Sequence, residues 1–84
     1  MLYAAKCYWP GVTDVDLEDA AARLGRDVSV GYMGSLVFPA EALVLCLISA
    51  EAKGSVRAAS ERAGIPCERV MSTRWIAEER GITC

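Results

Sequence analysis

The sequence predicts an α+β domain in which two helices cover one face of a four-stranded antiparallel sheet. Strand-length apolar segments alternate with two segments of helical periodicity, and the resulting order is β-α-β-β-α-β. The segment Leu43–Ile48 is apolar at six consecutive positions, so a strand there carries apolar side chains on both faces. Such a strand is expected at the centre of the sheet, where one face is covered by the helices and the other needs a second chain or a ligand.

The 84-residue chain is expected to form one domain, residues 1–84. Hydrophobic residues make up 54% of it, which is rich for so small a domain and suggests a buried interface. The net charge is −2 and there is no basic run, so nucleic acid is not an expected partner. No segment has the roughly 18 apolar residues of a membrane span, and the start lacks the pattern of a signal peptide. We therefore expect a cytoplasmic protein that binds neither nucleic acid nor membrane.

The first strand is expected over Leu2–Trp9 and ends at a Pro-Gly turn. A helix is expected to begin after Thr13, whose hydroxyl can cap it, with Asp16 completing a weak capping box. Gly25 is the expected end of this helix. Its buried stripe is expected to consist of Leu17, Ala20, Ala21 and Leu24.

The second strand is expected over Val28–Phe38. Its glycines, Gly31 and Gly34, predict a bulge, a close backbone approach or room for a ligand. Residues 39–41 are expected to form the turn of a hairpin into a third strand, Ala42–Ser49.

The second helix is expected over Ala52–Ala63. Its inner stripe is expected to contain Ala52, Val56, Ala59 and Ala63. The sequence Gly64-Ile65-Pro66 is the clearest helix stop in the chain. A fourth strand is expected over Arg69–Ile76, and the polar tail 77–84 is expected to be loose or packed against a partner. This order of elements is the ferredoxin-like split βαβ arrangement.

The chain has four cysteines and no histidine. Without histidine it lacks the commonest metal ligand and the commonest general base near neutral pH. No two cysteines form a CxxC pair, so we predict no metal ligands and no cofactor. We interpret Cys7 and Cys46 as small core residues, and Cys67, in a loop, and Cys84, at the end of the chain, as free thiols.

Several short motifs carry a family resemblance. They are Val30, Tyr32-Met33-Gly34-Ser35, Cys46, Val56-Arg57, Glu61-Arg62-Ala63-Gly64-Ile65-Pro66 and Arg69-Val70. In these motifs the chain resembles a bacterial family of small ferredoxin-like proteins, long known as a domain of unknown function, that includes an actinobacterial nickel-binding protein. The chain departs from the family at Ser49, where relatives usually have glutamate, and it lacks the histidine expected for nickel binding. The resemblance therefore implies the fold and a dimeric α/β-barrel-type assembly, and no metal ligand.

Three hypotheses for the function follow. The first is a binding or assembly module: a homodimer whose facing sheets, or gaps between sheet and helices, hold a small apolar or aromatic molecule or simply each other. The candidate ligand-binding residues are Tyr3, Tyr8, Trp9, Tyr32, Ser49 and Trp75.

The second hypothesis is a cofactor-free cyclase or isomerase that works in a barrel cavity. Its base would be Glu41, an activated tyrosine or Cys46, and Tyr32 or Arg74 would stabilise an enolate-like negative charge. This enzyme needs Glu41 and Arg74 inside an enclosed cavity near Tyr32, whereas solvated positions favour binding or assembly. The third hypothesis is nickel or other transition-metal binding through cysteines and carboxylates, with Cys7 and Cys46 as neighbours on adjacent strands.

Overall fold

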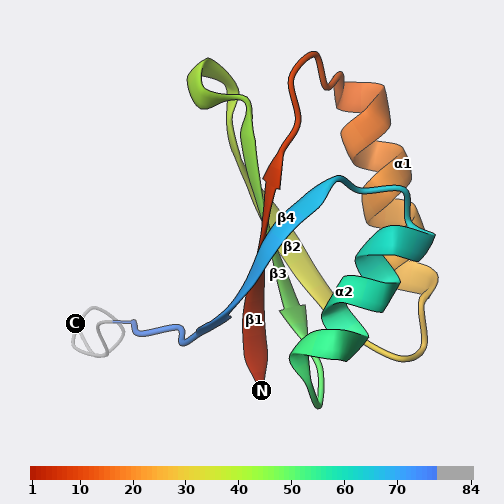
Figure 1. Cartoon of the computed structure of the whole chain (residues 1–84), viewed down its shortest axis with the longest axis vertical. Helices are drawn as coiled ribbons and strands as arrows, with labels where there is room; N and C mark the ends of the chain where they lie inside the picture. The colour runs from red at the N-terminus through yellow and green to blue at the C-terminus, as the bar shows by residue number, and fades with distance from the viewer. Residues whose placement is uncertain (78–84) are drawn as a thin grey trace, which may run out of the picture.

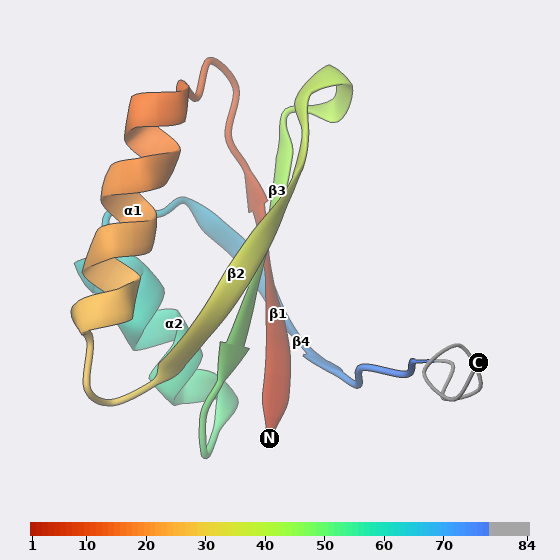
Figure 2. The ribbon, with the colours of Figure 1, turned by 180° about the vertical axis from the view of Figure 1, so that it is seen from behind.

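The computed structural model describes residues 1–77 of the chain. Its elements are β1 (Leu2–Tyr8), α1 (Asp14–Arg26), β2 (Gly31–Phe38), the short 3-10 turn η1 (Pro39–Glu41), β3 (Leu43–Ser49), α2 (Lys53–Arg62) and β4 (Cys67–Thr73). The strands form one antiparallel sheet in the order β2-β3-β1-β4. Both helices lie on the same side of the sheet (Figure 1; Figure 2 from behind). The predicted ferredoxin-like α+β fold is confirmed, with β1 and β3 at the centre.

The core lies between the sheet and the two helices. Along β3, the side chains of Val44, Cys46 and Ile48 are buried against the helices. The alternate residues of β3 are only half-buried, because they lie on the face opposite α1 and α2. From the helices, Leu24 and Val56 fill the same core and are almost completely buried.

The start of α1 matches the predicted capping box. The Asp16 amide donates to the Thr13 hydroxyl over 3.1 Å, and the Thr13 amide donates to the Asp16 carboxylate over 3.0 Å. The end of α1 differs from the prediction, because the helix runs through Gly25 to Arg26 and is capped by Asp27.

The end of α1 is held by a contact from the other helix. The Asp27 carboxylate accepts hydrogen bonds from the Ser29 amide (3.1 Å) and the Ser29 hydroxyl (2.6 Å). Arg62, at the end of α2, forms an ion pair with Asp27 at 2.8 Å and also donates to the Ser29 hydroxyl. This network holds residues 27–29 in a turn, so β2 begins at Gly31 and the predicted start at Val28 is wrong.

The predicted bulge in β2 is confirmed. Tyr32 pairs with Ile48 and Gly34 with Leu47, so Met33 has no partner in the ladder. Gly34 has φ of 142°, a conformation that residues with a Cβ rarely adopt. The bulge leaves the Met33 side chain 66% exposed.

The second helix is shorter than predicted. Ala52 is its exposed N-cap, so its place in the inner stripe is wrong, whereas Val56, Ala59 and Ala63 are buried as predicted. Gly64 adopts the expected left-handed conformation, with φ of 74°.

The fourth strand spans Cys67–Thr73 in place of the predicted Arg69–Ile76. The strand stops at Thr73 because this residue pairs with Leu2, the first residue of β1, and the antiparallel partner extends no further. Cys67 therefore lies in the strand rather than in a loop. Residues 78–84 of the predicted tail, Cys84 among them, lie outside the described residues. Within residues 1–77, no helix combines the length and the apolar character needed to cross a bilayer.

Acid is expected to weaken the network at Asp27. Hydrogen bonds from Ser29, and then from Arg62, hold the pKa of Asp27 below its ordinary value of 3.8. The folded-state pKa is thus lower than the unfolded one, so this stabilisation is present above the unfolded pKa and is lost as the pH falls through the folded one. The Asp27→Asn variant should show a smaller drop in urea midpoint than the wild type between about pH 6 and about pH 3.

The Asp19→Asn variant is the matched control, because Asp19 is an exposed carboxylate on the same helix. It should keep the full acid sensitivity of the wild type. An equal loss of midpoint in the wild type and Asp27→Asn would show that Asp27 has no part in this sensitivity.

Candidate functional site

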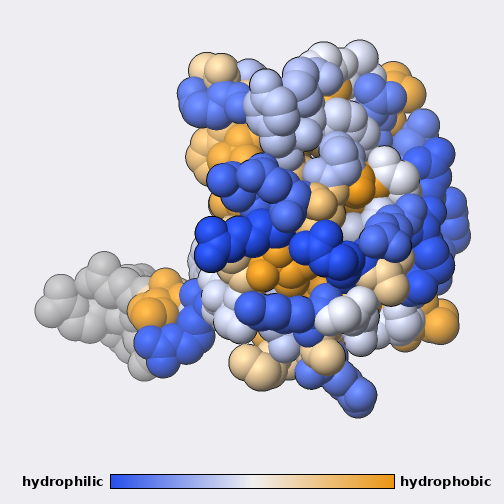
Figure 3. Space-filling model, viewed as in Figure 1, coloured by the Kyte–Doolittle hydropathy of each residue, from blue (hydrophilic) through white to orange (hydrophobic). Residues whose placement is uncertain are grey.

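The face of the sheet opposite α1 and α2 is apolar over most of its width. The register places Leu43, Leu45 and Leu47 of β3 on this face, beside Leu36 and Phe38 of β2. Leu36 is 52% exposed and Phe38 is 38% exposed. We call this set of five residues the outer apolar face. Apolar surface is visible below the tip of the β2–β3 hairpin, next to hydrophilic side chains (Figure 3).

Two basic side chains limit the outer apolar face on one side. Lys6 of β1 and Arg69 of β4 are direct partners across the ladder, and Lys6 also pairs with Leu45. Paired residues share a face of the sheet, so both cations lie on the uncovered side. Burying an unpaired charge against an apolar surface is costly, so this half of the face is the less suitable one for apolar contact.

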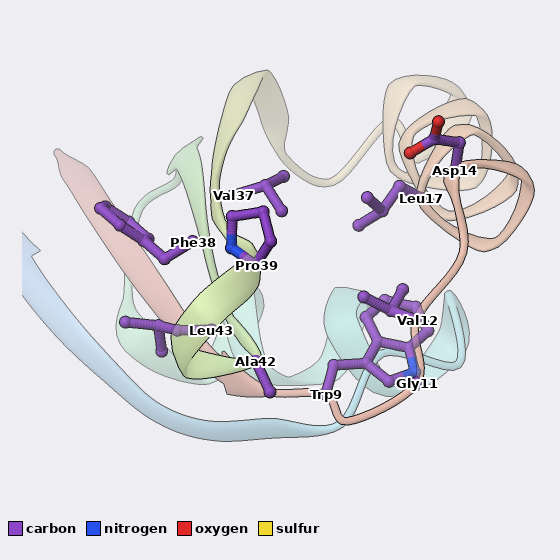
Figure 4. A pocket seen from close by; sticks show the side chains of 10 residues that line it. All are labelled: Trp9, Gly11, Val12, Asp14, Leu17, Val37, Phe38, Pro39, Ala42 and Leu43. Carbon is purple, nitrogen blue, oxygen red and sulfur yellow. The ribbon is translucent and has the colours of Figure 1, made fainter.

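A pocket of about 170 Å³ opens at the end of the sheet that carries the β2–β3 hairpin. It lies between the β1–α1 loop, the first turns of α1 and the hairpin (Figure 4). Its lining consists of Trp9, Gly11, Val12, Asp14, Leu17, Val37, Phe38, Pro39, Ala42 and Leu43. Almost all of these residues are apolar, and Asp14 alone among them carries a charge.

Main-chain contacts hold the walls of this pocket together. The Trp9 amide donates to the Ala42 carbonyl over 2.7 Å and so ties the end of β1 to the hairpin. Ala42 has φ of 53°, which turns the chain from η1 into β3. Phe38 and Leu43 line the pocket and also belong to the outer apolar face, so the two surfaces meet at the hairpin.

A row of polar side chains crosses the helix-covered face of the sheet. On β2, the Tyr32 hydroxyl lies 2.7 Å from the Ser35 hydroxyl, which donates to Cys46 Sγ on β3 at 3.4 Å. The thiol of Cys7 on β1 lies next to Cys46 and to Cys67 on β4. The prediction that Cys7 and Cys46 are buried neighbours on adjacent central strands is confirmed.

The thiols in this row differ in acidity. A hydrogen bond from Cys7, aided by one from Ser35, lowers the pKa of Cys46 to about 7. The same hydrogen bond to Cys46, together with burial, raises the pKa of Cys7 far above its usual value. Burial is also the main cause of the raised pKa of Cys67.

The described residues contain no cluster of three or more cysteine, aspartate or glutamate side chains arranged to hold a metal ion. The thiols stand on three successive strands, β3, β1 and β4, and form a row rather than a shell around one point.

The structure does not gather the predicted ligand-binding residues in one place. Tyr3 is buried in the core, Tyr32 packs against its edge, and Trp9 lines the pocket. The other three are exposed: Tyr8 and Ser49 at opposite ends of the sheet, and Trp75 beyond β4.

The candidate catalytic residues are also far apart. Glu41 is exposed in η1, the turn between β2 and β3. Leu43, just after this turn, pairs with the last residue of β2 and with the last residue of β1, so Glu41 lies at the end of the sheet where β1 ends. Arg74 is exposed just after Thr73, which pairs with the first residue of β1. The two side chains therefore lie at opposite ends of the sheet.

Sequence reasoning missed most of the pocket. Val12, Asp14, Leu17 and Val37 were not among the predicted ligand-binding residues. A signal existed in the predicted topology, because the Pro-Gly turn after β1 and the hairpin turn before β3 must lie at the same end of an antiparallel sheet.

Comparison with known proteins gives one structural likeness. No family model matches the chain, and no curated protein matches it. Among solved structures, the crystal structure of SCO4226 from Streptomyces coelicolor A3(2) superposes with a TM-score of 0.78. The two sequences are 20% identical, and the match covers 92% of this chain and 100% of the other. At this identity the likeness shows a shared fold.

The acidity of Cys46 is expected to depend on Ser35. In the Ser35→Ala variant the thiolate loses a hydrogen-bond donor, so the pKa of Cys46 should rise from about 7 toward its ordinary value of 9.0. The pH dependence of the Cys46 Cβ resonance measures this change. Ser55→Ala on α2 is the control and should leave the titration unchanged, and an unchanged titration in Ser35→Ala would show that the hydrogen bond is not formed.

Proposed function

We propose that this protein is a cytoplasmic assembly module that forms a homodimer through its outer apolar face. The observation that carries the proposal is the row Leu43, Leu45 and Leu47 on a central strand, flanked by Leu36 and Phe38 and covered by no element among residues 1–77. Large contiguous apolar patches on a protein surface mark interaction sites. A second copy of the chain offers the same apolar surface, and a symmetric dimer buries both at once.

The size of the sheet suits such an interface. Strands of seven residues spaced about 4.8 Å apart, with a rise of about 3.4 Å per residue, give a face of roughly 24 by 19 Å. Its projected area is roughly 450 Å². The accessible area is larger than this projection because side chains stand up from the sheet, and a standard stable complex buries roughly 800 Å² per partner.

The basic pair suggests where the twofold axis runs. If the axis passed through Lys6, the two copies of this ammonium group would meet in a desolvated interface, which is costly. An axis through the β2–β3 half instead brings Leu36 and Leu45 together and leaves Lys6 and Arg69 toward the rim. We therefore place the centre of the proposed dimer on β2 and β3.

The Leu45→Glu variant tests the dimer. A carboxylate in the middle of the interface is expected to dissociate it, so the mass in solution should fall by half while the far-ultraviolet circular dichroism spectrum is kept. Light scattering coupled to size-exclusion chromatography measures the mass. Val15→Glu is the matched control, because Val15 is 65% exposed on α1, away from the sheet face, and it should leave the mass unchanged.

A Val44→Glu variant separates loss of assembly from loss of fold. Val44 is 1% exposed in the core, so a charge there should unfold the chain rather than dissociate it. A wild-type protein with the mass of one chain at all concentrations would refute the proposed dimer, whatever the variants do.

We propose a second role, the binding of a small apolar or aromatic molecule in the pocket beside Trp9. The specific observation is a pocket of about 170 Å³ between sheet and helix, whose lining residues are mostly apolar in type. Drug-sized ligands need about 300 Å³ or more, whereas an apolar cavity of about 150 Å³ is enough for benzene. The expected occupant is therefore a single aromatic ring or a molecule of similar size.

Phenol is a suitable probe for this role, and Trp9 reports its binding. A Trp75→Phe background leaves Trp9 as the only tryptophan, because the chain has two. Phenol should change the Trp9 emission with a saturable dependence on concentration. Adding Val37→Phe should fill the pocket and abolish saturation, whereas Val28→Phe, on a fully exposed side chain, should not. A linear, non-saturating response in the background protein would count against a binding site.

Binding or assembly is favoured over the cyclase or isomerase hypothesis. The enzyme needed Glu41 and Arg74 in one enclosed cavity near Tyr32, and both are exposed at opposite ends of the sheet. The family resemblance supports the proposed dimer, because it implies a dimeric α/β-barrel-type assembly. We further propose that the chain belongs to that ferredoxin-like family, and the fold shared with the Streptomyces protein supports this assignment.

A further inference from the structure

The thiol row on the helix-covered face is used neither by the proposed dimer nor by the pocket. Cys7 has no exposed surface, Cys46 is 4% exposed, and Cys67 is partly exposed at the start of β4. Cys7 stands between the other two thiols and lies next to both. A buried cysteine that lies beside two further cysteines can do more than fill the core, since neighbouring thiols can be oxidised to a disulfide.

Strand register decides which pair can close. Cys7 and Cys67 are direct partners across the β1–β4 ladder. Direct partners in an antiparallel pair have Cα atoms about 4.5 to 5.5 Å apart, within the range of about 4.4 to 6.8 Å that a disulfide spans. Cys46 pairs with Ala5, so it is a diagonal neighbour of Cys7, and diagonal neighbours are about 7 to 8 Å apart. The geometry thus favours Cys7–Cys67 over Cys7–Cys46.

The ladder is also irregular beside this pair. The register between β1 and β4 shifts between Lys6 and Cys7, which leaves Glu68 as an extra residue. A bulge of this kind disrupts the ladder locally and lets the strand bend. The start of β4 can therefore adjust to a disulfide more easily than the regular centre of the sheet.

We propose that Cys7 and Cys67 form a reversible disulfide when the protein meets a small-molecule disulfide such as oxidised glutathione. Cys67, the most exposed of the three, reacts first: its thiolate attacks one sulfur of the small disulfide, forms a mixed disulfide and releases one thiolate. Cys7 then attacks the Cys67 sulfur, and the second small thiolate leaves. The protein loses two hydrogen atoms, and the protons of Cys7 and Cys67 end on the two released thiols.

The pKa values of these thiols affect how fast the disulfide forms, whereas the strand register decides which cysteine pairs with Cys7. Burial raises the pKa of Cys67, and the hydrogen bond to Cys46 raises that of Cys7, so both attacking thiols are mostly protonated near neutral pH. The reaction is therefore expected to be slow at neutral pH and to speed up as the pH rises, because the thiolate is the nucleophile. Closure links β1 to β4 on the covered face and leaves the outer apolar face unchanged.

The test uses the full chain with Cys84→Ser, because Cys84 lies outside the described residues and could cross-link two copies. After incubation with oxidised glutathione and removal of excess reagent, the expected product is two hydrogen atoms lighter than the starting protein. Only one of its three remaining cysteines should react with a thiol reagent after unfolding. Peptide mapping without reduction should join Cys7 to Cys67, and dithiothreitol should reverse the change.

Matched variants identify the pair. Cys46→Ala should still form the disulfide, whereas Cys67→Ser and Cys7→Ala should not. In Cys7→Ala, a stable glutathione adduct on Cys67 should replace the disulfide. If buried Cys46 carries no adduct in the same sample, the variant has reacted in its folded form. Three outcomes would overturn the proposal: no loss of thiols in the parent protein, a persistent adduct on Cys67 of the parent, or a Cys7–Cys46 link.

Discussion

The structure depends on one constraint, which is that β3 is apolar on both faces while the helices among residues 1–77 cover only one of them. Its inward residues Val44, Cys46 and Ile48 form the centre of the core between sheet and helices. Its outward leucines are only half-buried. Burial of apolar area gives roughly 25 cal/mol per Å², so an uncovered leucine row leaves a substantial stabilisation unused. Self-assembly through this face is the simplest way to obtain it.

Local chemistry made much of the fold predictable. Thr13 and Asp16 satisfy the first amides of α1 from within four residues, and Gly64 supplies the left-handed turn that ends α2. The doubly apolar β3 could be placed at the sheet centre because a strand has only two faces. The bulge in β2 followed from Gly34, since few residues other than glycine adopt its conformation. Each of these signals is contained in a few neighbouring residues.

The errors arise where distant residues decide. The end of α1 depends on Arg62, 35 positions beyond the Asp27 carboxylate that it binds. The bounds of β4 are set by the length of β1, so Cys67 was placed in a loop and its pairing with Cys7 could not be seen. The pocket beside Trp9 needs the β1–α1 loop and the hairpin together, and their contact is a main-chain hydrogen bond between Trp9 and Ala42. No sequence spacing reports such contacts.

Because alternate residues of a strand face opposite sides, the outer apolar face of the proposed dimer and the thiols of the proposed disulfide lie on opposite sides of the sheet. In β1, Lys6 and Tyr8 belong to the outer side, while Cys7 between them points to the core and meets the other thiols. The two faces of the sheet belong to the same strands, so a disulfide on the inner face would form close to the outer face without adding atoms to the outer face. The two would be coupled only through the backbone of β1 and β4. The proposed dimer is centred on β2 and β3. The proposed disulfide between β1 and β4 would therefore form or break at the edge of the assembly and not at its centre.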